Sequence, residues 1–245
     1  MNKYANQSEI SKFSQLSHDW WNTSGEFKAL HKINPIRMKF ILDNIYQHFN
    51  IVSYFNKPLY KINILDVGCG GGLICEPLTR LGGNVLGIDA DPNAISIAKK
   101  HAKSEDLDIK YENKTLNDLT NLKAKKFDVI LALEIIEHLD DIQSFLLTTK
   151  ALLKKDGVIF ISTLNKTFKS LLLAKIAAEY ILHWVPKGTH DWQKFITPKQ
   201  LQNEMKELDM ERFNIKGIAY NPLKTIWALT DDTSINYITA YKNTY

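Results

Sequence analysis

The chain contains few cysteines and no concentrated basic segment. Its 245 residues include only Cys69 and Cys75. Neither has the spacing or the partners of a disulfide framework or a zinc site, so we expect a reducing compartment. No block of five or six basic residues occurs, and the formal net charge is only +4. Composition therefore gives no reason to expect a nucleic-acid partner.

The sequence also lacks segments that direct a protein into or through a membrane. Its first 20 residues contain no apolar stretch of the secretory type. The most apolar segment, residues 171–185, carries Lys175 and Glu179 and is too short to span a bilayer. We therefore expect a cytoplasmic protein. Its mild positive charge is compatible with peripheral contact with the anionic inner face of a membrane.

Apolar runs alternate with helical patterns between residues 62 and 163, which is typical of βαβ units. Strands are predicted at 62–67, 84–90, 109–113, 127–133 and 157–163, and helices at 73–81, 92–103 and 141–153. Asp91 followed by Pro92 is a strong helix start. These units predict an α/β fold with a parallel sheet and helices on both faces. Ligands bind at the carboxyl ends of such strands.

The regions on either side of these units have a different character. Residues 1–60 are predicted to be helical and to cover the ligand cleft, with aromatic side chains at Phe13, Trp20, Trp21 and Phe27. A long helix is predicted at 168–183, and a short one begins at Thr197 and ends near residue 208. Residues 212–220 and 234–242 alternate as antiparallel strands do. With no repeat or linker, residues 1–245 are expected to form one domain.

The densest chemical signal is the segment INILDVGCGGG at residues 62–72. Gly68, Gly70 and their neighbours let the backbone turn sharply and approach a ligand closely. Asp89 ends the next apolar run, about 20 residues later, where an acid binds ribose hydroxyls. The pattern therefore predicts an adenosine-containing ligand, either a dinucleotide or S-adenosylmethionine.

Two details favour S-adenosylmethionine. The turn reads GxGGG, with Leu73 where a dinucleotide-binding turn has its third glycine. Asp66 precedes the turn, and its negative charge would repel a pyrophosphate but suit a cationic sulfonium ligand. A nicotinamide-dependent oxidoreductase is the alternative that both details disfavour.

Three segments, LDVGCGGG, GIDA and FDVILALEIIEHLDD, resemble the successive signatures of class I S-adenosylmethionine-dependent methyltransferases. Four further segments, WW…GEFKALHKINPIR, STLNKTFKS, AEYIL…VPKGTHDW and FITP, resemble the ubiquinone biosynthesis O-methyltransferase family. The resemblance runs from about Trp20 to the C-terminus. It implies a Rossmann-like fold with a mostly parallel seven-stranded sheet and an antiparallel C-terminal strand pair.

The same resemblance implies the ligands and partners. S-adenosyl-L-methionine would be the methyl donor, and polyprenylated phenols, catechols or quinols of ubiquinone biosynthesis would be the acceptors. Other enzymes of that pathway are candidate partners. The alternatives are another small phenolic acceptor, or a member without catalytic activity that organises the pathway.

The resemblance also assigns residues that contact the cofactor. Arg37 in NPIR, Gly68, Asp89 and Leu133 match such positions. A guanidinium fork suits a carboxylate, as on the cofactor, although the residue alone reads equally well as a surface arginine. The segment NKTLNDL after the third strand departs from many class I enzymes, so the adenine contact stays unassigned.

The segment EIIEH, with Glu134, Glu137 and His138, supplies the candidate catalytic residues. If it is helical, the three side chains share one face and could hold Mg²⁺, which prefers oxygen ligands. Such an ion would acidify the acceptor phenol. His138 could instead act alone as the general base, or the acids could simply complement a helix dipole. The resemblance to the family favours the metal site. His190 in KGTHDW is a second candidate base.

Residues 165–197 form a second functional candidate, an inserted helix and loop. The apolar side chains of residues 171–185 exceed what one core stripe requires. An ordinary buried helix is one interpretation. The other is an interfacial cover, with Tyr180 and Trp184 at the headgroup level, that admits a polyprenyl-tailed substrate or contacts the membrane.

Overall fold

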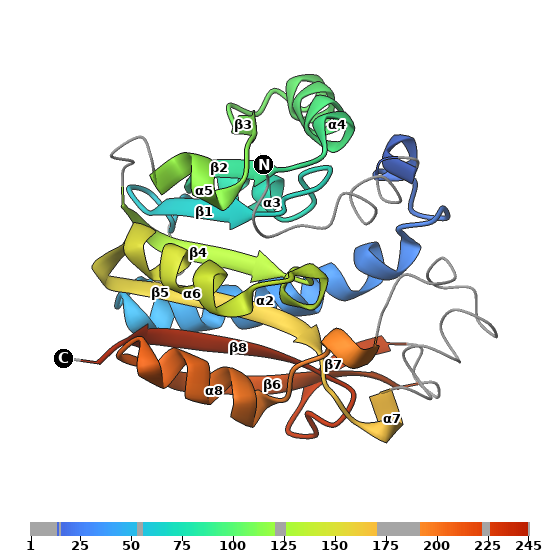
Figure 1. Ribbon diagram of the computed structural model, residues 1–245. Helices are drawn as coiled ribbons and strands as arrows, with labels where there is room; N and C mark the ends of the chain where they lie inside the picture. The colour runs from blue at the N-terminus through green and yellow to red at the C-terminus, as the bar shows by residue number, and fades with distance from the viewer. Residues whose placement is uncertain are drawn as a thin grey trace.

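Eight strands form one mixed sheet in the order β3-β2-β1-β4-β5-β8-β6-β7 in the computed structural model of the chain (Figure 1). The structure describes residue 14 and residues 16–52, 56–120, 126–170, 192–221 and 226–244. The predicted α/β class with a mostly parallel sheet is confirmed.

Five neighbouring strands of the sheet are parallel. They are β1 (Asn63–Val67), β2 (Asn84–Asp89), β3 (Lys110–Asn113), β4 (Phe127–Leu133) and β5 (Leu153–Leu164). All five were predicted within a few residues of their ends, and β1, β4 and β5 form nearly continuous apolar runs because they are buried on both faces. Their carboxyl ends lie along the same edge of the sheet.

Three antiparallel strands complete the sheet, where the sequence predicts two. They are β6 (Met210–Asn221), β7 (Ile226–Thr230) and β8 (Asn236–Asn243), and β8 lies between β5 and β6. The count of seven strands is therefore wrong by one. The missed strand, β7, has five residues and pairs with β6 at the sheet edge. Its residues are exposed or half-buried, so no buried apolar run indicates it in the sequence.

Helices cover both faces of the sheet, as predicted. One face packs against α2 (Lys28–His48), α3 (Cys75–Arg80) and α4 (Pro92–Ser104), through side chains such as Ile41, Leu78 and Ile95. The other face packs against α5 (Leu116–Thr120), α6 (Ile142–Leu152) and α8 (Pro198–Glu207), through Phe145 and Leu201 among others. Short elements lie between them: η1 (Ser17–Asp19), η2 (Ile136–His138), α7 (Phe168–Ser170) and η4 (Trp192–Lys194).

Side-chain caps begin three of these helices. Asp91 Oδ1 accepts a hydrogen bond from the Asn93 amide at 2.9 Å, and Asp141 Oδ1 accepts one from Ser144. Thr197 and Gln200 form a capping box at the start of α8. Each cap satisfies an amide that lacks a partner within the helix. The starts predicted at Pro92 and Pro198 are therefore confirmed.

The N-terminal segment lies beside the carboxyl ends of the parallel strands. In Figure 1 the arrowheads of β1 and β4 point toward the side on which η1 and the beginning of α2 lie. The structure describes the first residues of the helix predicted at 168–183, which form α7. The remainder lies outside the described residues. Among the helices that the structure describes, none is both long and apolar enough to cross a bilayer.

Candidate active site

The glycine turn after β1 is fastened to the end of β2. The amides of Gly68 and Cys69 both donate to the Ile88 carbonyl, at 2.8 and 3.0 Å. The Gly70 amide donates to Asp89 Oδ2 at 2.9 Å. Gly68 and Gly70 have φ values of +70° and +52°, a region that residues with side chains rarely adopt. The predicted glycines therefore adopt a backbone conformation that would be strained in a residue with a side chain.

Asp89 lies at the carboxyl end of β2, as predicted. Its other carboxylate oxygen accepts the Asp91 amide at 2.8 Å. Burial is the main cause that raises the pKa of Asp89 above its ordinary value. Both of these hydrogen bonds come from backbone amides, so the carboxylate is held in a fixed orientation at the edge where ligands bind.

Asp66 occupies a different place from the one that the charge argument assumed. It is only 3% exposed, and its Oδ2 accepts a hydrogen bond from Cys75 Sγ at 3.2 Å. Burial raises the pKa of Asp66 to about 7. Its carboxyl group therefore faces the interior beside α3 and is partly protonated at neutral pH. Asp66 would therefore repel a pyrophosphate less than an exposed carboxylate would.

Arg37 and Glu134 form an ion pair at the same edge of the sheet. Arg37 projects from α2 and its side chain is 5% exposed, and its Nη2 lies 2.6 Å from Glu134 Oε1. Ser162 Oγ donates to the same carboxylate oxygen at 2.8 Å. Arg37 Nε is buried and has no hydrogen-bond partner among the described residues. A buried guanidinium N–H without an acceptor marks a place for an anionic ligand group.

The backbone of Glu134 is strained. Its φ is +55°, and its amide donates to the Ser162 carbonyl at 2.9 Å. A residue with a side chain pays on the order of 1–3 kcal/mol for such a conformation, which is found most often at functional sites. This turn directs Glu134 toward Arg37.

Glu137 points into the protein instead. It is 2% exposed, and Thr163 Oγ1 donates to its Oε2 at 2.8 Å. Burial, and then the charge of Glu134, raise the pKa of Glu137 to about 7, while the neighbouring His138 opposes that rise. Its Oε1 is buried without a hydrogen-bond partner among the residues the structure describes.

The expectation that Glu134, Glu137 and His138 share one helical face is wrong. Glu134 has a left-handed backbone, and the single helical turn η2 begins only at Ile136. In the described part of the chain, no group of three or more His, Cys, Asp or Glu side chains is placed to hold a metal ion. The structure does not bring the three predicted ligands together as a metal site.

The remaining predicted residues divide into two groups. Leu133 is half-buried, ends β4 at the ligand edge and packs against the core on the α2 side. His190, Tyr180, Trp184 and Phe13 lie outside the described residues. Sequence reasoning missed Ser162 and Thr163, which lie near the carboxyl end of β5 and donate hydrogen bonds to Glu134 and Glu137. Their segment, STLN, had been noted only as a family resemblance.

Aromatic side chains of the N-terminal segment pack on the glycine turn. A Cβ placed on Gly70 or Gly71 would lie 2.4 or 2.6 Å from atoms of the Trp20 side chain. Trp20 in turn stacks on Phe27, with ring centroids 3.9 Å apart. The carboxylate of Asp91 accepts hydrogen bonds from Ser14 Oγ and Ser17 Oγ at 3.0 and 2.6 Å. The described residues between 14 and 27 therefore contact both the turn and Asp91, which follows β2.

Residues 42–212 match the model of a methyltransferase domain family. The chain is 48% identical to the ubiquinone biosynthesis O-methyltransferase of Pelagibacter ubique, covering 96% of this chain and 97% of that protein. It is 44% identical to the protein of the same name from Bartonella bacilliformis, covering 96% and 95%. The chain belongs to the ubiquinone biosynthesis O-methyltransferase family. The predicted family is thereby confirmed.

Solved structures support the fold of this family member. A magnesium protoporphyrin IX methyltransferase from Synechocystis, with bound SAH, superposes with a TM-score of 0.66 at 14% identity. The match covers 96% of this chain and 95% of that one. An S-adenosylmethionine-dependent methyltransferase from Clostridium acetobutylicum superposes with a TM-score of 0.63, also at 14% identity, covering 96% and 99%.

Asp66→Asn is expected to stabilise the protein at pH 8 and to lose most of that advantage at pH 5. The native state holds the Asp66 proton up to about pH 7, whereas an ordinary aspartate loses it near 3.8. Between these values the native state binds more protons than the unfolded state, so the free energy of unfolding falls as the pH rises. Asparagine has no proton to release and still offers an oxygen to Cys75.

Thermal unfolding of both proteins at pH 5 and pH 8 measures this effect. We expect a gain of about 1 kcal/mol or more at pH 8, with about 2–4 °C in Tm for each kcal/mol. Asp118→Asn is the control, because Asp118 is exposed and its pKa is lowered by hydrogen bonds from Thr115. An equal change in Tm at the two pH values would contradict the placement of Asp66.

Proposed function

We propose that this chain transfers a methyl group from S-adenosylmethionine to a phenolic oxygen of polyprenylated intermediates in ubiquinone biosynthesis. The acceptors would be of the 2-polyprenyl-6-hydroxyphenol and 3-demethylubiquinol types. The observation that carries the proposal is the similarity, over nearly the whole of both chains, to relatives named for this reaction. The arrangement at the carboxyl edge of the sheet supports it with residues suited to each part of the donor.

The residues present fit S-adenosylmethionine. We assign Asp89 to the ribose hydroxyls, because its carboxylate is fixed at the end of β2 beside the glycine turn. Arg37 Nε is a buried donor without a partner among the described residues, and a carboxylate would satisfy it. Gly68 keeps the turn free of a Cβ that would otherwise collide with Ile135. Leu133, at the end of β4, would contribute apolar contact.

The chain must also remove a proton from the acceptor. When bound, S-adenosylmethionine supplies a methyl group on a positively charged sulfur, open to attack by an oxygen nucleophile. A phenol has a pKa of about 10 and is therefore mostly protonated at neutral pH. We assign His138, whose side chain is partly exposed, as the group that takes this proton from the acceptor, and the buried Glu137 as the group that can receive it in turn. The pKa of Glu137 is raised to about 7, so its carboxylate can take up a proton near neutral pH.

Glu134 would orient the acceptor hydroxyl and Arg37. Its Oε1 already receives the Arg37 guanidinium and the Ser162 hydroxyl, so its carboxylate is held at the edge of the site. The proton transfer proposed here uses these side chains alone, because in the described part of the chain the three predicted ligands are not placed together as a metal site. The involvement of a divalent ion stays a prediction from the family resemblance, and a methyl-transfer assay with chelation tests it.

The domain organisation and cellular setting belong to the same proposal. Residues 1–245 would form one domain, with residues 1–60 covering the cofactor and residues 165–197 covering the acceptor. The polyprenyl tail of the acceptor partitions into lipid, which supports a cytoplasmic enzyme that works at the inner face of an anionic membrane. Other enzymes of the pathway would be its partners.

A methyl-transfer assay tests the proposed function. Purified protein is incubated with methyl-labelled S-adenosylmethionine and a short-chain prenylated catechol, with and without exhaustive chelation. We expect label in the extracted catechol, as a methyl ether, in both arms. Loss of activity on chelation, with recovery on adding Mg²⁺, would establish the metal and overturn the metal-free proton transfer. No label in either arm, with or without Mg²⁺, would overturn the proposed function.

Asp89→Ala is expected to weaken S-adenosylmethionine binding at least tenfold, measured by titration calorimetry without acceptor. The substitution removes the ribose acceptor and also the partner of the Gly70 amide. Asp89→Asn keeps an oxygen for that amide and separates the two effects. Asp43→Ala is the control, because Asp43 pairs with the exposed Lys39 on the surface of α2. Unchanged affinity in Asp89→Ala would refute the cofactor assignment.

Glu134→Gln is expected to abolish turnover while cofactor binding is retained. Glutamine preserves an oxygen for Ser162 and Arg37 but carries no negative charge. We expect kcat to fall at least a hundredfold and the Kd for S-adenosylmethionine to stay within threefold. Glu105→Gln is the matched control, since Glu105 also pairs with an arginine, Arg80, at 2.7 Å. A kcat equal to that of wild type would contradict a role for Glu134 in the reaction.

A further inference from the structure

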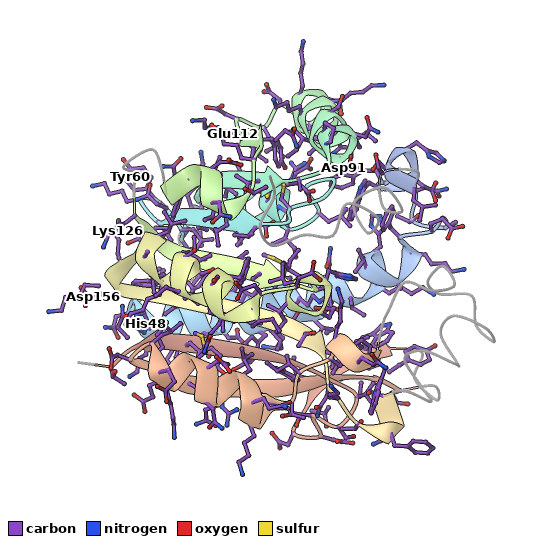
Figure 2. All side chains as sticks on the ribbon, viewed as in Figure 1. His48, Tyr60, Asp91, Glu112, Lys126 and Asp156 are labelled. Carbon is purple, nitrogen blue, oxygen red and sulfur yellow. The ribbon has the colours of Figure 1, made fainter. Side chains whose placement is uncertain are left out.

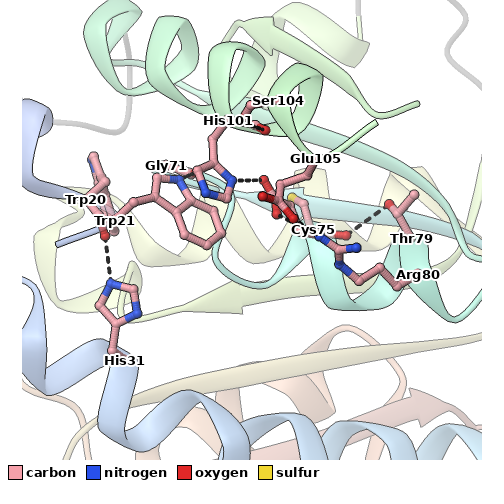
Figure 3. Close-up of polar contacts among 11 residues, drawn as sticks. Trp20, Trp21, His31, Gly71, Cys75, Thr79, Arg80, His101, Ser104 and Glu105 are labelled. Carbon is pink, nitrogen blue, oxygen red and sulfur yellow. Dashed lines mark hydrogen bonds and ion pairs between the residues drawn. The ribbon is translucent and has the colours of Figure 1, made fainter. Parts of the chain in front are cut away.

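Trp21 joins the N-terminal segment to the glycine turn and to two helices that cover the sheet (Figure 3). Its Nε1 donates to the Gly71 carbonyl at 2.9 Å. Its ring lies flat on the imidazole of His101 in α4, with centroids 3.4 Å apart and planes within 3°. His101 Nδ1 lies 2.7 Å from Glu76 Oε1 in α3. One continuous chain of contacts therefore runs from Glu76 through His101 and Trp21 to the turn.

The carboxylate of Glu76 is the buried end of this series of contacts. It is 3% exposed, and besides His101 it has Arg80 at the longer distance of 3.9 Å. A buried carboxylate that loses its hydrogen-bond donor is costly. His101 Nδ1–H is therefore held toward Glu76, and this hydrogen bond orients the face of the imidazole ring on which Trp21 stacks.

The glycine turn is held from two sides by this series of contacts. Trp21 donates to the carbonyl of Gly71, and the amide of Glu76 donates to the carbonyl of Gly72 at 3.1 Å. The consecutive carbonyls of Gly71 and Gly72 are thus bound by the two ends of this series of contacts, Trp21 and Glu76. A displacement of Trp21 would therefore displace the backbone of the turn directly.

The N-terminal segment has a second attachment near Asp89. Ser14 and Ser17 donate to Asp91, whose amide in turn donates to Asp89. Between these two attachments, Trp20 rests on Gly70 and Gly71, and its Nε1 is buried without a hydrogen-bond partner among the described residues. The segment thereby contacts the glycine turn directly, and Asp89 through Asp91.

We propose that Glu76, His101 and Trp21 form a latch that holds the N-terminal segment closed over the bound cofactor and sets how fast the cofactor leaves. The three are positioning residues, since they act through the glycine turn and the covering segment. The inference rests on the proposed function for the identity of the ligand. The latch lowers the dissociation rate of S-adenosylmethionine and of its demethylated product, and it leaves the chemistry at the acceptor oxygen to other residues.

Two conservative variants each break one link of the latch. Trp21→Phe keeps an aromatic face for His101 but removes the hydrogen bond to Gly71. His101→Gln can still donate to Glu76, so the buried carboxylate keeps a partner, but it removes the stacked ring. His48→Ala is the matched control, because His48 also stacks on an aromatic ring, that of Phe213, and bonds the Asp156 carbonyl. His48 and Asp156 lie far from Asp91 (Figure 2).

The test measures S-adenosylmethionine binding to the full chain by calorimetry, and its dissociation by chasing labelled cofactor with excess unlabelled cofactor. For Trp21→Phe and His101→Gln we expect a Kd and a dissociation rate that rise about tenfold. The KM for the cofactor should rise similarly, while kcat falls by less than threefold. The double variant should add little to the larger single effect, because the links act in series. His48→Ala should bind as wild type does.

The outcomes separate the latch from the function on which it rests. Wild-type protein that binds no S-adenosylmethionine would overturn the proposed function before any variant is compared. If wild type binds but both variants keep a Kd and dissociation rate within twofold of it, the latch is refuted. Variants with a lowered Tm and unchanged binding would likewise refute it, since the contacts would then be merely structural. A kcat that falls as much as kcat/KM would move these residues into the chemical step.

Discussion

The attachment of the glycine turn to the end of β2 is the constraint on which the candidate site depends. Three consecutive amides, of Gly68, Cys69 and Gly70, are bound to the Ile88 carbonyl and the Asp89 carboxylate. These bonds bring the loop after β1 and the acid after β2 to one point at the carboxyl edge. These hydrogen bonds, together with the Asp91 amide that also donates to Asp89, fix the turn and the carboxylate in place before the cofactor binds.

The acidic residues around this point show how position within the fold separates similar groups. Asp66, Asp89, Glu134 and Glu137 all lie near the ends of parallel strands, yet each has different surroundings. Asp66 and Glu137 are buried, which raises the pKa of each to about 7. Glu134 instead meets Arg37 through a left-handed backbone turn. Carboxyl groups with such different partners and burial can take different parts in one reaction.

Much of the fold was predictable because buried parallel strands and capped helices leave strong local signals. The strand at 127–133 and the helix start at Pro92 follow directly from an apolar run and from an Asp-Pro pair. Strand β7 left no such signal, since it exists through its pairing with β6. In the site, the residues themselves pointed to the glycine turn and Asp89, whereas Arg37 was assigned only through the family resemblance. The prediction that Glu134, Glu137 and His138 share one helical face was wrong, because the predicted helix is a single turn that begins after Glu134.

The sequence by itself determined the family, the α/β class and the location of the turn, since these depend on residue types at short, regular spacing. Only the tertiary structure decided which groups meet. Ser162 and Thr163 reach the two glutamates from the neighbouring strand, and Trp21 reaches His101 across 80 positions of chain. The direction in which a buried carboxylate points depends on the donors packed around it, and those donors come from strands and helices remote in sequence.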